Sequence, residues 1–486
     1  MPNNTTNKLD LNLVIKLFFS FSLGVWVQAI INFFSVPVIT FLISPAEFGK
    51  ATMYSTLYSL LLLVVLAGSD QSYVRSYYEM EKDKRSQLLW TCLLTPILIF
   101  IIVSLFLIIF SGKLSLVVVG EPGHSIGVLV SLSLFSGILQ VFNLTSIRMQ
   151  KKGFLYSAVF IVQSLVNVSG TIVYAIFFGR SFYAIVYGQI LSNFIAFLVG
   201  FAFEHSHIFP VKIDRQLLKS VISYGLPLLP SAFLWWLFTW LSRISLRMFS
   251  NFVELGYFSA AFKLSYVLYM IYSGFQNFWL PVAYETYEKD RENKNFFADT
   301  AGLITFVMAL FALLVVAFKD IIFLIMAKEY APASRVLPFL LLSPVILAVL
   351  TVTARGINFA KKTYWFILSD AICVIVNFAG NMVLIPLLGA RGAAISTGIS
   401  FVVLFATETH ISKKLFPVKY PLSKIYLTFL FLILDFAVAT FIEKSLVVYV
   451  FTTINIIAVC LLNLDWIKRG VRLTLSSIRT KSFWLS

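Results

Sequence analysis

Two arginines spaced four residues apart, Arg243 and Arg247, lie in a strongly apolar stretch of the chain. In a helix this spacing places both guanidinium groups on one face, and the planar fork of arginine suits bidentate binding of a phosphate or carboxylate. Trp236 and Trp240 share that face, where their indole rings can stack on a sugar ring. The alternative is structural: snorkelling arginines beside an aromatic belt at the end of a membrane span.

Four further basic residues are candidates for binding an anion. Lys263 lies deep in an apolar stretch, where a charge is costly unless it lines a cavity or pairs with a carboxylate. Arg148, Arg355 and Arg75 each come at or soon after the end of an apolar stretch. Charges at such places also serve simply to orient a span in the membrane, so both roles are open for these three residues.

Three carboxylates within apolar stretches, Asp370, Glu408 and Asp435, are candidates for carrying a coupling ion. A carboxyl group in a low-dielectric cavity binds a proton more readily than one in water, so it can load and release a proton near neutral pH. Glu408 lies five residues before Lys413 and can instead reach the membrane interface. Asp435 lies outside the repeated part of the chain and can support structure or contact a partner. Asp370 is therefore the first candidate.

Prolines in apolar stretches mark candidate hinges, because proline removes a helical hydrogen bond and neighbouring helices can satisfy the freed carbonyl. Pro37, Pro227 and Pro230 are the candidates. Asn167 and Asn377, which the repeat described below pairs, are expected to hydrogen-bond between helices. The three cysteines are widely spaced, and no phosphate-binding loop, metal-ligand cluster or nucleophile with an adjacent base is recognisable. The sequence therefore predicts neither an enzyme nor a cofactor or metal site.

The composition places these residues in a membrane protein. Hydrophobic residues make up 59% and charged residues 12% of the 486 residues, with a mean hydropathy of +0.90. A soluble protein carries about 25% charged residues. No cleavable signal peptide is expected, because the first apolar stretch is too long. Spans of ~20 apolar residues are predicted at 13–43, 51–69, 88–110, 125–147, 154–178, 182–203, 217–248, 254–280, 296–318, 333–354, 364–388, 392–412, 425–442 and 445–464.

The basic residues set the orientation of these spans. With the N-terminus inside, the cytoplasmic segments carry 27 lysines and arginines and the opposite segments carry 10. This bias places both termini in the cytoplasm, which an even number of spans allows. The net charge of +16 is therefore topological, and no nucleic-acid partner is expected.

The apolar chain contains an internal repeat. At an offset of 210, residues 151–188 match 361–398 at 10 of 38 positions, and an offset of 207 pairs Glu47 with Glu254. Several identical residues are glycine or asparagine, which the alternative, chance matching of apolar segments, does not explain. A duplicated apolar bundle is typical of secondary transporters, whose cargo site lies between the repeats.

The repeat predicts an all-α polytopic membrane protein of about 14 helices. A six-helix bundle is expected in residues 1–204, a cytoplasmic loop in 205–216 and a second six-helix bundle in 217–416. Residues 417–486 are expected to form helices 13 and 14 and a basic cytoplasmic tail. Both copies start from the same side, so the repeat is expected to be parallel, about an axis along the membrane normal.

Two pairs of stretches carry a family resemblance. The first pair is Ile-Ser-Pro-Ala-Glu-Phe-Gly at 43–49 with Gly-Ser-Asp-Gln-Ser-Tyr-Val-Arg-Ser-Tyr-Tyr at 68–78. The second is Tyr-Gly-Leu-Pro-Leu-Leu-Pro-Ser at 224–231 with Leu-Gly-Tyr-Phe-Ser-Ala-Ala-Phe-Lys at 255–263. They resemble the Wzx-type O-antigen and polysaccharide flippases of the multidrug/oligosaccharidyl-lipid/polysaccharide superfamily. Relatives often have Asp-Arg late in the seventh span, where this chain has Ser242-Arg243.

The resemblance implies a cargo and a mechanism. The cargo would be an undecaprenyl-pyrophosphate-linked oligosaccharide, a repeat unit of O-antigen or another surface polysaccharide. It would move from the cytoplasmic to the periplasmic leaflet of the bacterial inner membrane by alternating access, without ATP hydrolysis. A polysaccharide polymerase and a chain-length regulator are the expected partners, besides membrane lipids. The alternatives are a cation-coupled multidrug or small-molecule exporter of the same superfamily, a peptidoglycan-precursor flippase, and a membrane glycosyltransferase or polymerase.

Overall fold

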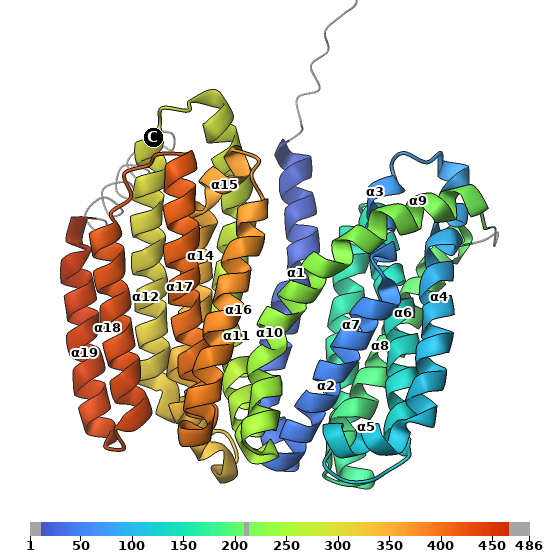
Figure 1. Ribbon diagram of the computed structural model, residues 1–486, viewed down its shortest axis with the longest axis horizontal. Coiled ribbons are helices and arrows are strands. Elements are labelled where there is room, and N and C mark those ends of the chain that lie inside the picture. The colour runs from blue at the N-terminus through green and yellow to red at the C-terminus, as the bar shows by residue number, and fades with distance from the viewer. Residues whose placement is uncertain (1–10, 209–212, 466–486) are drawn as a thin grey trace, which may run out of the picture. The chain divides into compact units, whose positions relative to one another are not determined.

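The computed structural model describes residues 11–208 and 213–465, which contain helices and no strand. The chain divides into two compact units, Met1–Trp236 and Leu237–Ser486 (Figure 1). The boundary between the units falls inside a helix, α10 (Leu229–Phe249). The six-plus-six-plus-two division expected from the sequence stays a prediction, and its basic tail and part of its loop lie outside the described residues.

The first unit holds the helices up to the first part of α10. They are α1 (Leu11–Leu42), α2 (Pro45–Leu66), α3 (Ser69–Ser76), η1 (Lys82–Lys84), α4 (Arg85–Ile109), α5 (Ser111–Val118), α6 (Ser125–Met149), α7 (Gly153–Phe177), α8 (Phe182–Ile208), α9 (Arg215–Gly225) and η2 (Leu226–Leu228). Within this unit α3 and α9 lie side by side at one end, and α5 lies at the other end (Figure 1).

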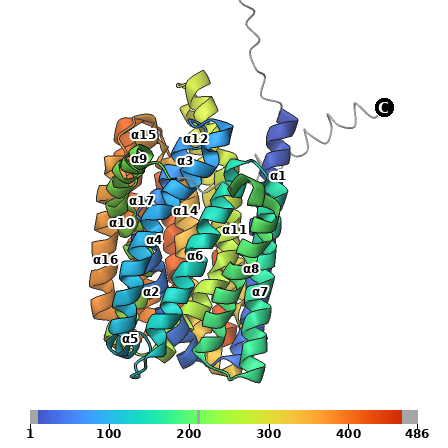
Figure 2. The ribbon, with the colours of Figure 1, turned by 90° about the vertical axis from the view of Figure 1, so that its right-hand side faces the viewer.

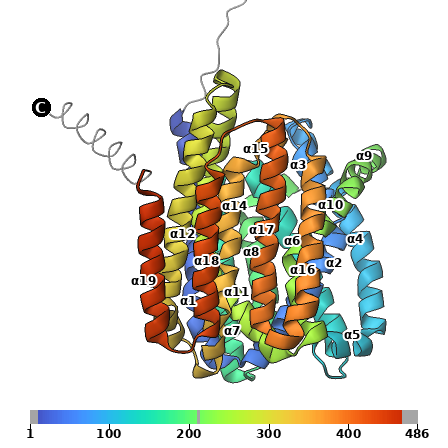
Figure 3. The same cartoon turned by 60° about the vertical axis from the view of Figure 1, so that its left-hand side comes forward.

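The second unit holds the rest of α10 and the helices that follow. They are α11 (Phe252–Lys289), α12 (Lys294–Leu324), η3 (Lys328–Arg335), α13 (Leu337–Leu340), α14 (Leu342–Thr353), α15 (Arg355–Phe359), α16 (Tyr364–Leu388), α17 (Ala390–Leu415), α18 (Leu422–Phe441) and α19 (Ser445–Leu462). Figure 3 shows α12, α18 and α19 packed side by side in this unit.

The described helices confirm a polytopic all-α membrane protein. Twelve helices are long and apolar enough to cross a membrane, and a bent pair, Lys328–Arg335 with Leu337–Thr353, makes a thirteenth candidate. α11 lies where the eighth span was expected but is less apolar than these. The 55° bend in the pair breaks the expected span 333–354, and Pro332 and Pro338 explain it because neither can donate a helical hydrogen bond.

The seventh expected span, 217–248, lies within one candidate span, Arg215–Phe249, whose helical geometry changes locally. The amphipathic helix α9 ends at Gly225, the 3-10 turn η2 follows, and α10 begins at Leu229. Pro227 lies in η2 and Pro230 in the first turn of α10, so these prolines coincide with a local 3-10 turn. Pro37 lies inside α1, which continues through it. A hinge motion at these prolines remains a prediction.

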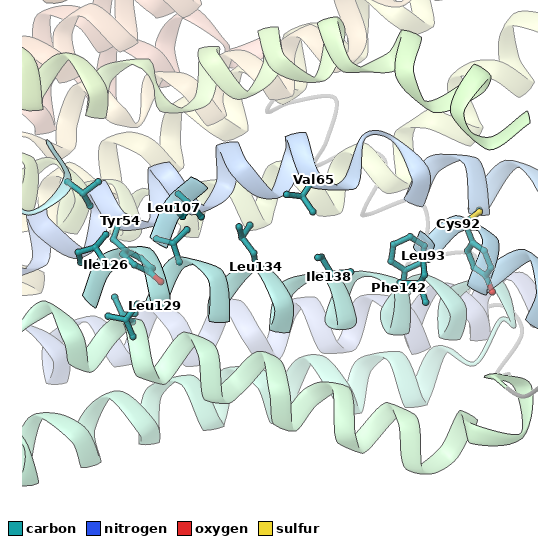
Figure 4. Packing of buried hydrophobic residues seen from close by; sticks show 14 of the residues in the cluster. Tyr54, Val65, Cys92, Leu93, Leu107, Ile126, Leu129, Leu134, Ile138 and Phe142 are labelled. Carbon is teal, nitrogen blue, oxygen red and sulfur yellow. The ribbon is translucent and has the colours of Figure 1, made fainter. Parts of the chain in front are cut away.

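The core of the first unit is organised around α6. Apolar side chains from α2, α4 and α6 point toward one another along its length, including Tyr54, Leu93 and Leu134 (Figure 4). Small residues on α6 let its neighbours approach closely, and the Tyr54 hydroxyl lies 2.7 Å from Ser133 Oγ. Figure 2 shows α4, α6, α7 and α8 side by side in this unit.

The two units share a matched helix cap, formed by a glutamate in each copy of the repeat. Glu47 in the first turn of α2 accepts a hydrogen bond from the backbone N–H of Phe182, which opens α8, at 2.8 Å. Its repeat partner Glu254 accepts one from the N–H of Ala390, which opens α17, at 2.7 Å. In each copy the carboxylate compensates unsatisfied N–H groups and the helix dipole. These matched caps agree with the repeat expected from the sequence.

Two stretches that carry the family resemblance meet at a glycine pair in the first unit. Gly68 has φ +72°, a conformation that favours glycine, and a Cβ atom there would lie 2.8 Å from Gly225 Cα. Next to this contact the Ser72 hydroxyl donates to the carbonyl of Val221 at 2.8 Å. The glycines therefore let the end of α9 pack directly on the start of α3.

Candidate functional site

Arg243 lies buried in the second unit inside an aromatic cage. Its side chain is 7% exposed, and its guanidinium carbon lies 4.7 Å from the ring centre of Trp240, 5.6 Å from Phe258 and 4.4 Å from Phe262. Nη1 donates to the carbonyl of Thr239 at 2.8 Å. Among the described residues no carboxylate forms an ion pair with Arg243. A buried guanidinium held by aromatic faces and one carbonyl keeps donors for an anion.

The serine beside this arginine has a different role. Ser242 Oγ lies 2.9 Å from Thr397 Oγ1 on α17 and 3.3 Å from Asn377 Oδ1 on α16. Asn381 Nδ2 donates to the same Asn377 oxygen at 3.0 Å and to Ser245 Oγ at 3.3 Å. The network fastens α10 to α16 and α17, which confirms the interhelical role expected for Asn377. Ser242 thus serves helix packing, and Arg243 beside it has no ion-paired carboxylate within residues 11–208 and 213–465.

Lys263 lies on α11, directly after Phe262 of the Arg243 cage. Its side chain is exposed, and it lies about 17 Å from the start of this helix of 38 residues. Tyr266 on the same face is 51% exposed. A lysine charge at this depth is too costly to face hydrocarbon. A cavity-lining role for Lys263 therefore stays a prediction. Phe262 connects the two cations, because it forms one wall of the Arg243 cage and directly precedes Lys263.

The other aromatic and basic candidates on α10 have different surroundings. The Arg247 guanidinium carbon lies 4.4 Å from the ring centre of Phe252. Trp240 belongs to the Arg243 cage, whereas Trp236 is buried in the first unit, where its Nε1 donates to Ser59 Oγ at 2.9 Å. Phe233 stacks on it with ring centres 5.9 Å apart. Trp236 is therefore placed for packing, and Trp240 is the indole held against an arginine.

A second charged group in the second unit contains Arg355, Glu408 and Asp370. Glu408 on α17 is 6% exposed, and Asp370 and Arg355 are the charged groups that act on its carboxyl. Among the described residues neither carboxyl forms a hydrogen bond or ion pair. Arg355 Nε donates to the carbonyl of Thr351 at 2.7 Å. Burial lowers the pKa of Arg355, and Tyr284 opposes that shift. Asp370 on α16 and Glu408 on α17 thus lie on adjacent helices, where two interacting carboxyl groups can share a proton.

The remaining candidates lie apart from these two groups. Asp435 on α18 is fully buried, and Asn455 Nδ2 on α19 donates to its Oδ1 at 3.2 Å, so it links the last two helices. Arg148 is exposed at the end of α6. Arg75 is exposed in the first unit, 3.4 Å from Glu79, with its guanidinium carbon 5.7 Å from the ring centre of Tyr224. The contacts of Asp435 and Arg75 are therefore structural.

Sequence reasoning missed several residues that shape these groups. Asn381 follows Asn377 by four residues and therefore lies on the same helical face, a spacing that could have revealed the network with Ser242. The contact of Tyr284 with Arg355 could not be predicted, because α11 contains many tyrosines and nothing in the sequence distinguishes this one. Glu408 was ranked below Asp370 from its distance to Lys413, yet Glu408 is the more deeply buried carboxyl.

Comparison with known proteins decides the family. A family model described as "Polysaccharide biosynthesis protein" matches residues 14–287, more than half of the chain. The chain belongs to this family. A search of the curated proteins finds no significant match.

Solved structures show which fold this family member has. It is similar to a lipid II flippase, MurJ, in an inward closed conformation, with a TM-score of 0.69 and 15% identity over 94% of this chain and 99% of that one. An inward-facing MATE multidrug resistance transporter of the MOP superfamily matches with a TM-score of 0.52 and 14% identity, covering 84% and 95%. A MATE protein in the straight conformation matches with a TM-score of 0.53 and 15% identity, covering 85% and 96%. The chain thus has the same fold as these flippase and transporter structures.

Proposed function

We propose that the protein is a flippase for an undecaprenyl-pyrophosphate-linked oligosaccharide, the repeat unit of O-antigen or another surface polysaccharide. It would carry the unit from the cytoplasmic to the periplasmic leaflet of the bacterial cytoplasmic membrane by alternating access, with both termini in the cytoplasm. The polysaccharide-biosynthesis family and the fold shared with a lipid flippase support this proposal. The product would pass to a polysaccharide polymerase and a chain-length regulator.

The observation that carries the proposal is Arg243. A buried arginine without an acidic partner is costly in a membrane protein unless it meets an anion. Pyrophosphate offers several charge-assisted acceptors to a guanidinium, and the aromatic cage presents that guanidinium without competing for its N–H donors. The exposed Lys263 on the neighbouring helix supplies a second positive charge. Cations in this place favour an anionic lipid over the cationic drugs of a multidrug exporter.

The proposal includes coupling to an ion gradient through Glu408 and Asp370. Neither carboxyl has a direct partner among the described residues, so a proton or sodium ion can be taken up without first breaking an ion pair. Arg355 would then compete with the ion for Glu408 during the cycle. Asp435 would serve the packing of α18 on α19, because its carboxyl is fully buried against Asn455.

Replacing Glu408 with glutamine is expected to remove the response of transport to an imposed gradient, because the amide cannot take up a proton or bind sodium as a carboxylate does. The measurement is flipping of a lipid-linked oligosaccharide in proteoliposomes, with and without a proton or sodium gradient. Glu443→Gln is the matched control, since Glu443 is an exposed partner of Arg335 in the same unit. A Glu408→Gln variant that still speeds up when a gradient is applied would rule out this carboxyl as the coupling site.

Deletion of the gene in its native host tests the function itself. We expect loss of the surface polysaccharide, with single lipid-linked repeat units accumulating on the cytoplasmic side of the membrane. The readouts are surface glycan, and periplasmic accessibility of the lipid-linked precursor in spheroplasts. Intact surface glycan together with altered sensitivity to cationic drugs would contradict the proposal and indicate the exporter instead. Lost polymer with precursor already exposed in the periplasm would indicate a polymerase.

A further inference from the structure

The first unit contains a polar cavity that none of the charged candidates touches. Its volume is about 340 Å³, within the range of ~300–1,000 Å³ of small-molecule pockets. Side chains from α1, α2, α7 and α8 line it, and none of those described is charged. The amides among them are Gln28, Asn32, Gln163, Asn167, Gln189 and Asn193.

Three of these amides, Gln163, Gln189 and Asn193, are held in place by neighbouring polar side chains. Gln163 Nε2 donates to Asn193 Oδ1 at 2.8 Å, and Gln140 Nε2 donates to Gln163 Oε1 at 3.2 Å. The hydroxyl of Tyr58 reaches Asn193 and Gln189 from α2. Gly137 makes room for that hydroxyl, because a Cβ atom there would lie 3.2 Å from Tyr58 Cζ. The part of the wall formed by Gln163, Gln189 and Asn193 is therefore held by hydrogen bonds between helices.

The second copy of the repeat shows that the fold does not need these polar groups. At the same offset of 210, Gln163 corresponds to Cys373, Gln189 to Ile399, and Asn193 to Val403. The corresponding helices α16 and α17 form a matching pair without these amides. Polar side chains in a membrane bundle cost stability unless they are used.

Among the cavity-lining residues on α7 and α8, Asn167 alone has an identical partner in the second copy, and the two asparagines behave differently. Asn377 in the second copy is 4% exposed and closes a network with Ser242, Thr397 and Asn381. Asn167 in the first copy is half-buried and lines the cavity. The second copy therefore uses its asparagine for packing, whereas the first copy leaves its amides open to a ligand.

We propose that this cavity binds a neutral sugar ring, a part of the glycan that the cargo carries. Amides donate and accept hydrogen bonds at once, as the hydroxyls of an uncharged sugar require. A cavity without charged side chains offers no counter-charge for a phosphate or an ammonium group. The inference rests on the proposed function for the identity of its ligand, but sugar binding can be measured without transport.

The test is saturation-transfer NMR on the full-length protein in lipid nanodiscs with three neutral disaccharides: maltose, lactose and N,N′-diacetylchitobiose. We expect transfer to at least one of them, and at least a tenfold weaker apparent affinity in the variant Gln189→Ile/Asn193→Val, which installs the residues of the second copy. Ser169→Val is the matched control, since Ser169 is exposed on α7 away from the cavity. Gln163→Cys provides a second, single substitution should the double variant fail to fold.

Two results would overturn the inference: no transfer to any of the three sugars, or transfer of unchanged strength in the double and single variants. The outcome is independent of the gene deletion. Sugar binding with intact surface glycan in the deletion strain would leave a sugar site in a protein with another function. Lost surface glycan without sugar binding would keep the flippase and remove the cavity as its sugar site.

Discussion

Replacing Arg243 with alanine is expected to lower the rate of lipid-linked oligosaccharide flipping about 10- to 100-fold. Hydrogen bonds to charged groups contribute about 1.5–3 kcal/mol, and each 1.4 kcal/mol corresponds to about a factor of ten. Arg243→Lys should retain part of the activity, because it keeps the charge but loses the bidentate fork. The measurement is initial flipping rate in proteoliposomes at matched protein content.

The control for this prediction is Arg335→Ala, which removes an arginine of the same unit whose partner Glu443 is exposed. It should flip at the wild-type rate, since an exposed ion pair contributes little. Folding of Arg243→Ala is checked by thermal unfolding in detergent, and no loss of stability is expected because the variant also removes a buried charge. Flipping by Arg243→Ala at the rate of Arg335→Ala would exclude the caged guanidinium from cargo binding.

Replacing Lys152 with methionine is expected to destabilise the first unit strongly. Lys152 Nζ lies 2.5 Å from Glu204 Oε1, and the Glu204 side chain is 1% exposed while that of Lys152 is 40% exposed. Loss of one partner of a buried ion pair costs about 3–5 kcal/mol. The exposure of Lys152 reduces the expected loss to about 2–3 kcal/mol. Thermal unfolding in detergent should show the change as a lowered Tm.

The neighbouring residue gives the matched comparison. Lys151 is exposed and forms no ion pair among the described residues, so Lys151→Met should leave the Tm nearly unchanged. Adding Glu204→Gln to Lys152→Met should restore most of the lost stability, because the buried charge is then gone. Equal Tm values for Lys151→Met and Lys152→Met would show that the Lys152–Glu204 pair does not stabilise the unit.

The positions of most helices could be predicted from hydropathy, because a membrane helix must carry its apolar residues within one continuous stretch. The exceptions have local causes. Hydropathy averages over the prolines that break the segment 333–354, and α3 and α5 are too short to register as spans. α11 was expected to end near residue 280, yet it continues to Lys289 as an ordinary soluble-type helix with Glu285 and Lys289 paired on its surface.

The candidate site could be predicted only where its members are close in the sequence. Arg243 and Trp240 are three residues apart, and the helix brings them together, as expected. Lys152 and Glu204 come from helices separated by a hairpin, so no spacing rule pairs them. The amide cavity could not be predicted, because single asparagines and glutamines in apolar helices usually hydrogen-bond to a neighbouring helix. Only the fold shows that the amide side chains of the first unit line one cavity.

The two copies of the repeat have kept their caps and diverged in their linings. After a duplication the two copies can take different roles. Here both copies keep the cap formed by Glu47 or Glu254, while the residues on the helix faces beside Asn167 and Asn377 differ. A lineage that switches to a different surface glycan would then need only a handful of substitutions on α7 and α8, with the arginine cage untouched. Under the proposed function, differences among surface polysaccharides would be matched by sequence variation confined to the first unit.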